Sequence, residues 1–333
     1  MSVVKKCFKL LQLRQHFDWI PEREVIAYLR SWNRNLKTDE YGNLYLINPD
    51  TPLLCAHMDT VQREDSVNNL HTLRLNNWVI KAKDAVIWGD DKCGIAIAME
   101  IYEKMWDKVS LLFTRQEETG CNWAREFCNN HKELVELCKY CLVLDRRWWW
   151  DIIGYSNQYC SKEFENEIAR LTKEFWYKPT TGLSSDTGQI AKIINWVNLS
   201  VGYYNPHTKN EYINCNELIN AYEAASYIVQ NLQWEFPIYE FPKFWLYNNP
   251  LADDDDDEFD YWNRSFWCWY STYKKSKRWK KKDTFKETDL SDYFYVEPGW
   301  LLRVKKDIFL TNIADDTEWA ELSKGEYMVC EYT

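Results

Sequence analysis

The fold is decided by the stretch LLCAHMDT at residues 53–60, an apolar run that ends at a histidine and, two positions later, a carboxylate. Side chains at positions i and i+2 of a β-strand share a face, so a strand here would direct His57 and Asp59 to the same side. This arrangement is typical of a metal ligand and its orienting partner. A histidine and an aspartate that only solvate a strand end would have the same pattern, so the hypothesis depends on the rest of the chain.

Length, charge and cysteine usage narrow the class of protein. A chain of 333 residues is expected to form one large domain or two. Its 11 cysteines are odd in number and have no disulfide-framework spacing, which favours a reducing, cytoplasmic setting. The net charge of −10 argues against a nucleic-acid footprint over the whole protein. No apolar run approaches the roughly 18 to 20 residues of a membrane span, so we expect no membrane partner, and nothing indicates an oligomeric state.

The first third of the chain alternates helical and extended patterns. Apolar positions at helical spacing predict two helices within residues 3–33, and the alternation over 36–48 predicts a hairpin that leads into the strand at 53–57. Residues 85–88 are predicted to form another apolar strand, followed by Gly89, Asp90, Asp91 and a helix start. Helix capping alone would also favour aspartate at that position.

Three further apolar strands are each followed by candidate ligands. The strand predicted at 109–113 precedes Glu117 and Glu118, the strand at 140–144 precedes Asp145, and the strand at 197–201 precedes His207. In an α/β sheet, ligands bind at the carboxyl ends of strands. We therefore predict an α/β fold with a mixed central sheet flanked by helices, and a site at one edge of that sheet.

The chain changes character after residue 238. Residues 1–238 are predicted to form the catalytic domain, 239–290 a charged and aromatic linker, and 291–333 a small β-rich appendage. The linker contains an acidic run at 253–258 and a basic run at 274–282. Basic residues beside aromatic ones could instead bind single-stranded nucleic acid by stacking, but the acidic neighbour disfavours this.

The candidate residues define one kind of chemistry. Mixed imidazole and carboxylate ligands suit zinc, with Co²⁺ or Mn²⁺ as alternatives. Two ions that share Asp90 would each have one histidine and one further carboxylate, and would activate a bridging water and polarise a carbonyl. Glu117 is the candidate proton shuttle. The proposed metal ligands are His57, Asp90, Glu118, Asp145 and His207. Four cysteines, Cys121, Cys128, Cys138 and Cys141, have irregular spacing and are expected to be reduced core thiols.

These motifs, taken in order, resemble the co-catalytic di-zinc exopeptidase clan, which includes peptidase T, the aminoacylases and the single-domain bacterial aminopeptidases. The resemblance covers residues 1–235 and rests on His57-Met58-Asp59, Gly89-Asp90-Asp91-Lys92, Glu117-Glu118, Asp145 and His207. It implies that one zinc is held by His57, Asp90 and Asp145, and the other by Asp90, Glu118 and His207. It also implies that Asp59 steadies His57 and that Glu117 is the general base and acid.

The chain departs from peptidase T and the aminoacylases in one respect. Those proteins insert a lid or dimerisation domain between the fourth and fifth ligands, whereas only residues 146–206 lie between Asp145 and His207. The layout is therefore more similar to that of the single-domain aminopeptidases. Residues 184–187 could contact a substrate amine, although helix capping is the simpler interpretation. Residues 148–150, three tryptophans, could line a pocket or pack on a strand.

The resemblance implies an aminopeptidase that hydrolyses short peptides. Two alternatives stay open at the level of sequence. The same metal pair would serve an N-acyl amino acid deacylase, because only the pocket differs. A binding or structural protein could keep a peptidase-like core without activity, and the intact ligand set disfavours this.

Overall fold

The computed structural model describes residues 2–14, 16, 20–61, 72–83, 85–119, 122–182, 190–232 and 235–238, and five strands in the C-terminal part. The chain splits into two compact units, Met1–Leu251 and Ala252–Thr333. The linker predicted at 239–290 lies outside the described residues, and the predicted domain boundaries stay a prediction.

The strands of the second unit are β13 (Phe294–Glu297), β14 (Leu301–Val304), β15 (Ile308–Thr311), β16 (Trp319–Leu322) and β17 (Tyr327–Val329). The residues described in this unit all lie in strands.

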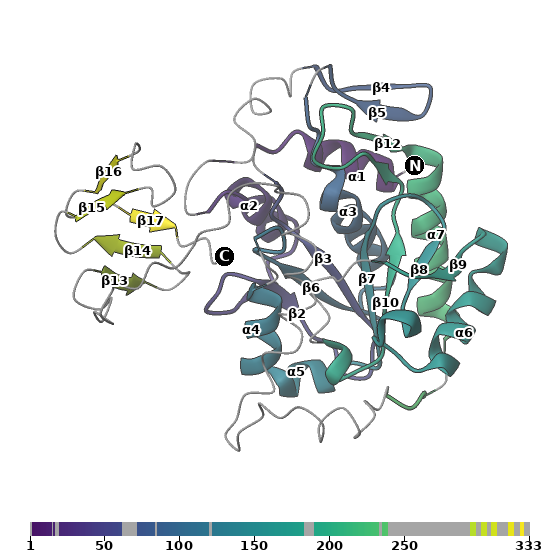
Figure 1. Ribbon diagram of the computed structural model, residues 1–333. Coiled ribbons are helices and arrows are strands. Elements are labelled where there is room, and N and C mark those ends of the chain that lie inside the picture. The colour runs from purple at the N-terminus through teal and green to yellow at the C-terminus, as the bar shows by residue number, and fades with distance from the viewer. Residues whose placement is uncertain are drawn as a thin grey trace. The chain divides into compact units, whose positions relative to one another are not determined.

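An eight-stranded mixed sheet forms the centre of the first unit (Figure 1). Strands β6, β3, β7 and β10 run parallel to one another at its centre, while β2 and β8 are antiparallel to their central neighbours. Parallel strands place their carboxyl ends at the same edge, which is where the candidate ligands follow. In sheet order the strands are β1 (Lys37–Thr38), β2 (Leu44–Leu46), β6 (Ser110–Thr114), β3 (Leu53–His57), β7 (Cys141–Arg146), β10 (Trp196–Ser200), β8 (Asp151–Ile153) and β9 (Lys178–Thr180).

Both faces of the central strands are buried. Leu54 and Ala56 of β3 pack into the main hydrophobic core with α1 (Ser2–Leu11), α3 (Gly89–Lys104) and α7 (Cys215–Asn231). Their neighbours Leu53 and Cys55 are also buried and, by the alternation of a strand, point to the other face. A strand buried on both sides is a continuous apolar run, which explains why the sequence pattern located it.

The remaining helices complete the layers around the sheet. They are α2 (Arg23–Trp32), α4 (Asn122–Asn130), α5 (Lys132–Glu136) and α6 (Lys162–Leu171). Helix α4 packs near β2, where the ring centroids of Phe127 and Tyr45 lie 5.3 Å apart. The predicted fold class, a mixed sheet flanked by helices, is confirmed.

A second sheet positions the loop that carries His207. Its order is β11 (Tyr203–Tyr204), β12 (Tyr212–Asn214), β5 (Val79–Lys81) and β4 (Arg74–Asn76). The loop between β11 and β12 contains His207, and β12 pairs with β5 through Ile213 and Ile80. This pairing holds the His207 loop near the segment that leads into α3.

The strand predicted at 85–88 is wrong. The structure assigns no strand to these residues, and α3 begins directly after them at Gly89. Their amide groups do not pair with a neighbouring strand: Ile87 and Trp88 donate to the carboxylate of Glu211. Trp88 has a φ of 58°, in the left-handed region, which breaks the extended pattern.

No separate lid domain occurs among the described residues between Asp145 and His207. The described part of this segment forms β8, α6, β9, β10, β11 and two short 3₁₀ helices, all within the first unit. The stretch 184–187, considered for substrate contact, lies outside the described residues. Within the described part of the chain, no helix is both long enough and apolar enough to cross a membrane.

Candidate metal centre

Asp90 stands at the centre of the candidate site. Its Oδ1 lies 3.0 Å from Nε2 of His57, and its Oδ2 lies 3.2 Å from Nε2 of His207. Each carboxylate oxygen therefore faces a different imidazole. Such a carboxylate could bridge two neighbouring metal ions, because one oxygen would be available to each.

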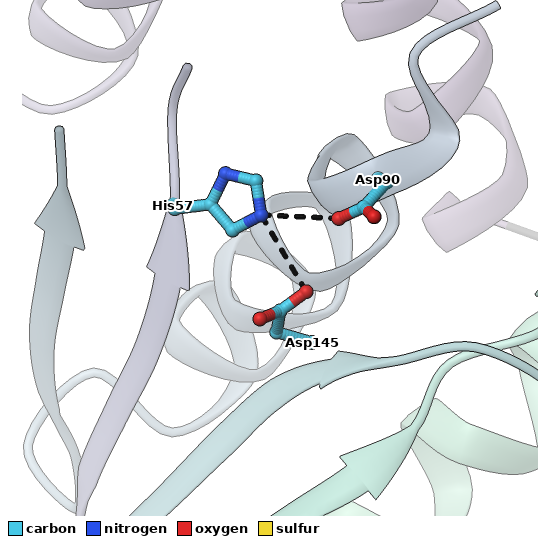
Figure 2. A group of neighbouring side chains, drawn as sticks. All are labelled: His57, Asp90 and Asp145. Atoms are coloured by element: carbon cyan, nitrogen blue, oxygen red, sulfur yellow. Dashed lines mark hydrogen bonds and ion pairs between the residues drawn. The ribbon is translucent and has the colours of Figure 1, made fainter. Parts of the chain in front are cut away.

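The first ligand group consists of His57, Asp90 and Asp145, and Figure 2 shows their side chains converging from three elements. His57 is the last residue of β3, Asp90 lies in the first turn of α3, and Asp145 lies near the end of β7. Nε2 of His57 is 3.5 Å from Oδ1 of Asp145. His57 is buried, so these acceptors surround it out of contact with bulk water.

The second ligand group consists of Asp90, Glu118 and His207. Nε2 of His207 lies 2.9 Å from Oε1 of Glu118. Glu118 follows β6 and His207 follows β11, so neither is part of a strand. Glu117 also comes close, because one of its carboxylate oxygens groups with His57 and Glu118. The structure thus brings together all five proposed ligands and the proposed base.

Asp59 orients the site through two different groups. Its backbone carbonyl accepts a hydrogen bond from Nδ1 of His57 at 2.8 Å, which leaves Nε2 to face the acidic residues. Its carboxylate lies further from that ring, at 3.7 Å, and instead accepts the backbone N–H groups of Glu117 and Glu118 at 3.1 Å each. The side chain therefore holds the turn that carries the proposed base and one proposed ligand.

Three supporting residues were not assigned a role from the sequence. Asp91 is fully buried and accepts the backbone N–H groups of His57 at 3.2 Å and Gly94 at 3.0 Å. Tyr203 donates its hydroxyl to Oδ1 of Asp145 at 3.4 Å. Glu211 accepts backbone N–H groups from the start of α3. In the sequence, only the paired aspartates and the position of Glu211 shortly after His207 pointed to these roles. Neither feature specifies which group the side chain would contact.

Acidic groups outnumber imidazoles at the site, and the pKa values follow from this. Burial by itself would lower the pKa of His57, but the charge of Asp145 and hydrogen bonds to Asp145 and Asp90 raise it well above its ordinary value. Burial likewise opposes the shift of His207, and its close contacts with the carboxylates of Asp90 and Glu118 raise its pKa to about 10. Burial raises the pKa of Glu118. Both imidazoles therefore hold protons tightly, in the place where a metal cation would displace them.

The donor set fits a pair of transition-metal ions. Oε1 of Glu118 and Nε2 of His207 are buried atoms that face one another, yet neither makes a hydrogen bond of normal geometry within the described part of the chain. This is the arrangement expected of two atoms that would bind the same metal ion. Imidazole nitrogen combined with carboxylate oxygen is the ligand type of zinc and similar metals.

The cysteines that the structure describes lie outside the ligand groups. Among the described residues, the groups that could hold a metal ion contain no cysteine. Cys128, Cys138 and Cys141 are buried thiols that form no disulfide bond, whereas Cys121 lies outside the described residues. Burial raises the pKa of the Cys138 thiol to about 12, so it stays protonated at neutral pH.

The fold and the paired ligand groups together define an α/β protein with a candidate two-metal centre. Neither a family model nor a curated protein matches the sequence. Solved structures do match. Aminopeptidase PepT from Bacillus cereus is 17% identical with a TM-score of 0.56, covering 69% of this chain and 97% of that one. A tripeptidase from Staphylococcus aureus is 15% identical with the same TM-score, covering 69% and 97%.

An archaeal structure shows the same likeness. The TET1 peptidase from Pyrococcus horikoshii is 14% identical with a TM-score of 0.53, covering 68% of this chain and 99% of that one. At these identities the likeness shows the fold alone. The resemblance to the di-zinc exopeptidases is thus confirmed as a resemblance of fold.

Proposed function

We propose that this chain is a metal-dependent exopeptidase, and specifically an aminopeptidase that removes the terminal residue of short peptides. The observation that carries the proposal is the placement of Asp90, whose two oxygens each face a histidine that also meets a further carboxylate. The solved structures with this fold, described as an aminopeptidase and a tripeptidase, support the same reaction class.

Two zinc ions are the proposed cofactors. His57, Asp90 and Asp145 would hold one, and Asp90, Glu118 and His207 the other. When bound, such a pair supplies Lewis acidity toward a carbonyl oxygen and lowers the pKa of water. The remaining steps belong to the protein's own side chains.

Glu117 is the proposed general base and acid. Its carboxylate would take a proton from the attacking water and deliver it to the nitrogen of the departing amine, which breaks the C–N bond of the peptide. The turn that carries it is held by Asp59, so its carboxylate stays next to the ligand groups. Asp59 also fixes which ring nitrogen of His57 faces the site.

The substrate and setting follow from the same features. All five proposed ligands and Glu117 lie in the first unit, and we propose that this unit binds a short peptide. The eight described cysteines are buried thiols that form no disulfide bond, which supports a reducing, cytoplasmic setting.

The direct test is to load the full chain separately with Zn²⁺, Co²⁺ or Mn²⁺, measure bound metal, and assay aminoacyl, acyl-amino acid and dipeptide substrates. We expect two zinc ions per chain and hydrolysis of aminoacyl substrates and dipeptides. Hydrolysis of acyl-amino acids alone would replace the aminopeptidase with a deacylase. A chain that binds no metal would contradict the proposal.

The bridging role of Asp90 has a separate test. Asp90→Ala removes one ligand from both groups and leaves two cations less shielded from one another, so both metals should be weakened. His207→Ala should empty mainly the second group. Metal stoichiometry of both variants distinguishes these outcomes, and unchanged metal content in the Asp90 variant would contradict the bridge.

A further inference from the structure

Glu211 makes an unusual set of contacts for a side chain outside the ligand groups. It is 1% exposed, and its two oxygens accept four consecutive backbone N–H groups. Oε2 accepts from Ile87 and Trp88 at 2.9 Å each, and Oε1 accepts from Gly89 at 2.8 Å and, more weakly, from Asp90 at 3.4 Å. The last of these four residues is the bridging ligand.

This segment depends on a side chain because no strand or helix satisfies it. The first N–H groups of a helix have no partner within that helix, and buried backbone groups require one. Residues 85–90 are buried and belong to no strand, so their amide groups have no sheet partner either. One carboxylate supplies what a neighbouring strand would otherwise provide.

The other end of Glu211 is fixed in the loop of the second histidine. Its backbone N–H donates to the carbonyl of Thr208, the residue after His207, at 3.1 Å. Strand β12 begins at the next residue and pairs with β5. Glu211 therefore joins two segments far apart in sequence, one carrying Asp90 and one carrying His207.

We infer that Glu211 is a positioning residue that holds the bridging ligand Asp90 in place relative to His207. This inference rests on the proposed function, because it concerns the same metal pair. The second ligand group contains Asp90 and His207, one from each of the two segments that Glu211 joins. The first ligand group contains only Asp90 from these segments. Loss of Glu211 should therefore weaken the second metal more than the first.

The closest variant is Glu211→Gln. Glutamine has nearly the same size, but one oxygen becomes an NH₂ group that cannot accept from two of the four amides. The matched control is Glu217→Gln, because Glu217 lies in the adjacent first turn of α7 and accepts from the Tyr204 hydroxyl at 2.6 Å and the Asn214 amide at 2.8 Å. The control perturbs a nearby carboxylate network that does not include residues 87–90.

The measurement is zinc affinity by competition with a chromophoric chelator, together with the unfolding temperature of the metal-free chains. His207→Ala shows which of the two equivalents belongs to the second group. We expect Glu211→Gln to weaken that equivalent by about tenfold or more, the usual cost of losing a residue that supports a ligand, with a smaller change in the first. Glu217→Gln should keep the parental ratio of the two affinities.

Several outcomes would overturn the inference. If Glu211 only caps the helix, Glu211→Gln should lower the unfolding temperature and reduce both zinc affinities equally. An unchanged ratio of the two zinc affinities in Glu211→Gln would therefore contradict the inference. If Glu211→Gln does not fold, Glu211→Asp, which keeps the charge but shortens the reach, must show the same preferential loss or the inference fails. A parent chain that binds no zinc would instead overturn the proposed function and this inference with it.

Discussion

Glu117 and Glu118 are adjacent, yet their proposed roles are separable by experiment. Glu118 faces His207 and belongs to the second ligand group, whereas Glu117 is assigned proton transfer. Glu117→Ala should keep both metals and lower turnover by two or more orders of magnitude, the usual contribution of a general acid-base group. Zinc content and kcat are the measurements. The matched variant Glu118→Ala should lose metal from the second group, and loss of both metals in the Glu117 variant would show that the roles are assigned wrongly.

Four of the chain's tryptophans have an unusual backbone conformation. Trp78, Trp88, Trp148 and Trp176 have φ values of 58° to 73°, in the left-handed region that glycine enters freely and bulky residues rarely adopt. The chain has 19 tryptophans and only 10 glycines. Average usage is about 7% glycine, more than twice the fraction found here. At these four positions, tryptophan occupies a backbone conformation suited to glycine.

Trp176→Gly should therefore stabilise the protein. Trp176 is 66% exposed and follows the short 3₁₀ helix at Lys173–Phe175 with φ 69°, so its side chain contributes little packing. The left-handed conformation costs a non-glycine residue about 1–2 kcal/mol, which exceeds the entropy that glycine adds to the unfolded chain. We expect a gain of up to about 1 kcal/mol in the free energy of unfolding, measured by urea titration. Trp176→Ala keeps the backbone cost and should show no such gain, as should Trp106→Gly, whose φ is not positive.

Glu100 makes the stability depend on acid pH. Burial would raise its pKa, but hydrogen bonds from Lys6, Ser2 and Lys104 outweigh it and bring the pKa from 4.5 to about 2. A carboxylate whose pKa is lower in the folded chain contributes stability above its unfolded pKa, and loses that contribution as the pH falls through the folded value. The relevant window therefore runs from about pH 4.5 down to about pH 2.

Glu100→Gln should reduce the free energy of unfolding at pH 7 by about 1.5–3 kcal/mol, the range for hydrogen bonds to charged groups. The difference from the parent should shrink as the pH falls below 4.5. Urea unfolding at pH 7, 4 and 3 checks this. Glu103 also contacts Lys6 but its side chain is 42% exposed, so Glu103→Gln should cost under about 1 kcal/mol. A difference for Glu100→Gln that does not vary with pH would contradict the account.

At the scale of elements, the turn after β6 is controlled by one side chain. Asp59 accepts the N–H groups of both Glu117 and Glu118, and the preceding Gln116 has a φ of 56°. Asn can accept with only one oxygen, so Asp59→Asn should loosen the turn while the bond from His57 to the backbone carbonyl of residue 59 persists. We expect kcat to fall about tenfold or more and the second metal to bind more weakly, while the first is retained. Selective loss of the first metal would show that the carboxylate acts mainly on His57.

The elements differ in how far the sequence predicts them. The central strands and the residues that follow them were predictable, because strands buried on both faces are continuous apolar runs and parallel strands collect their ends at one edge. The segment at 85–88 has the same apolar composition but is not a strand, because its amide partner is a side chain more than 120 residues away. Periodicity carries no information about such a partner. The same limit applies to Asp59. The sequence predicted that it would steady His57, whereas its carboxylate accepts the backbone N–H groups of the turn after β6.

At the scale of the whole molecule, residues 235–238 still pack against the core of the first unit. Phe236 packs edge-on against Phe164 of α6, with ring centroids 5.5 Å apart. The carbonyls of Phe236 and Pro237 accept hydrogen bonds from the side-chain amide of Asn195 at 3.3 and 3.0 Å. These contacts hold the chain against the first unit beyond the end of α7. All proposed ligands and Glu117 precede them in the sequence.

A chain of residues 1–238 should therefore fold and bind two zinc ions, because it keeps the core, the ligand groups and the contacts of Phe236. A chain of residues 1–232 should be less stable, because it exposes the face of Phe164 and leaves the Asn195 amide without its two acceptors, a cost of about 1–3 kcal/mol for the buried polar group alone. Zinc content, unfolding temperature and hydrolysis of an aminoacyl substrate are measured for both and for the full chain. Parental zinc content and activity in the 1–238 chain would assign residues 239–333 a role outside catalysis. An insoluble or metal-free 1–238 chain would make those residues part of the catalytic fold and contradict the boundary at 238.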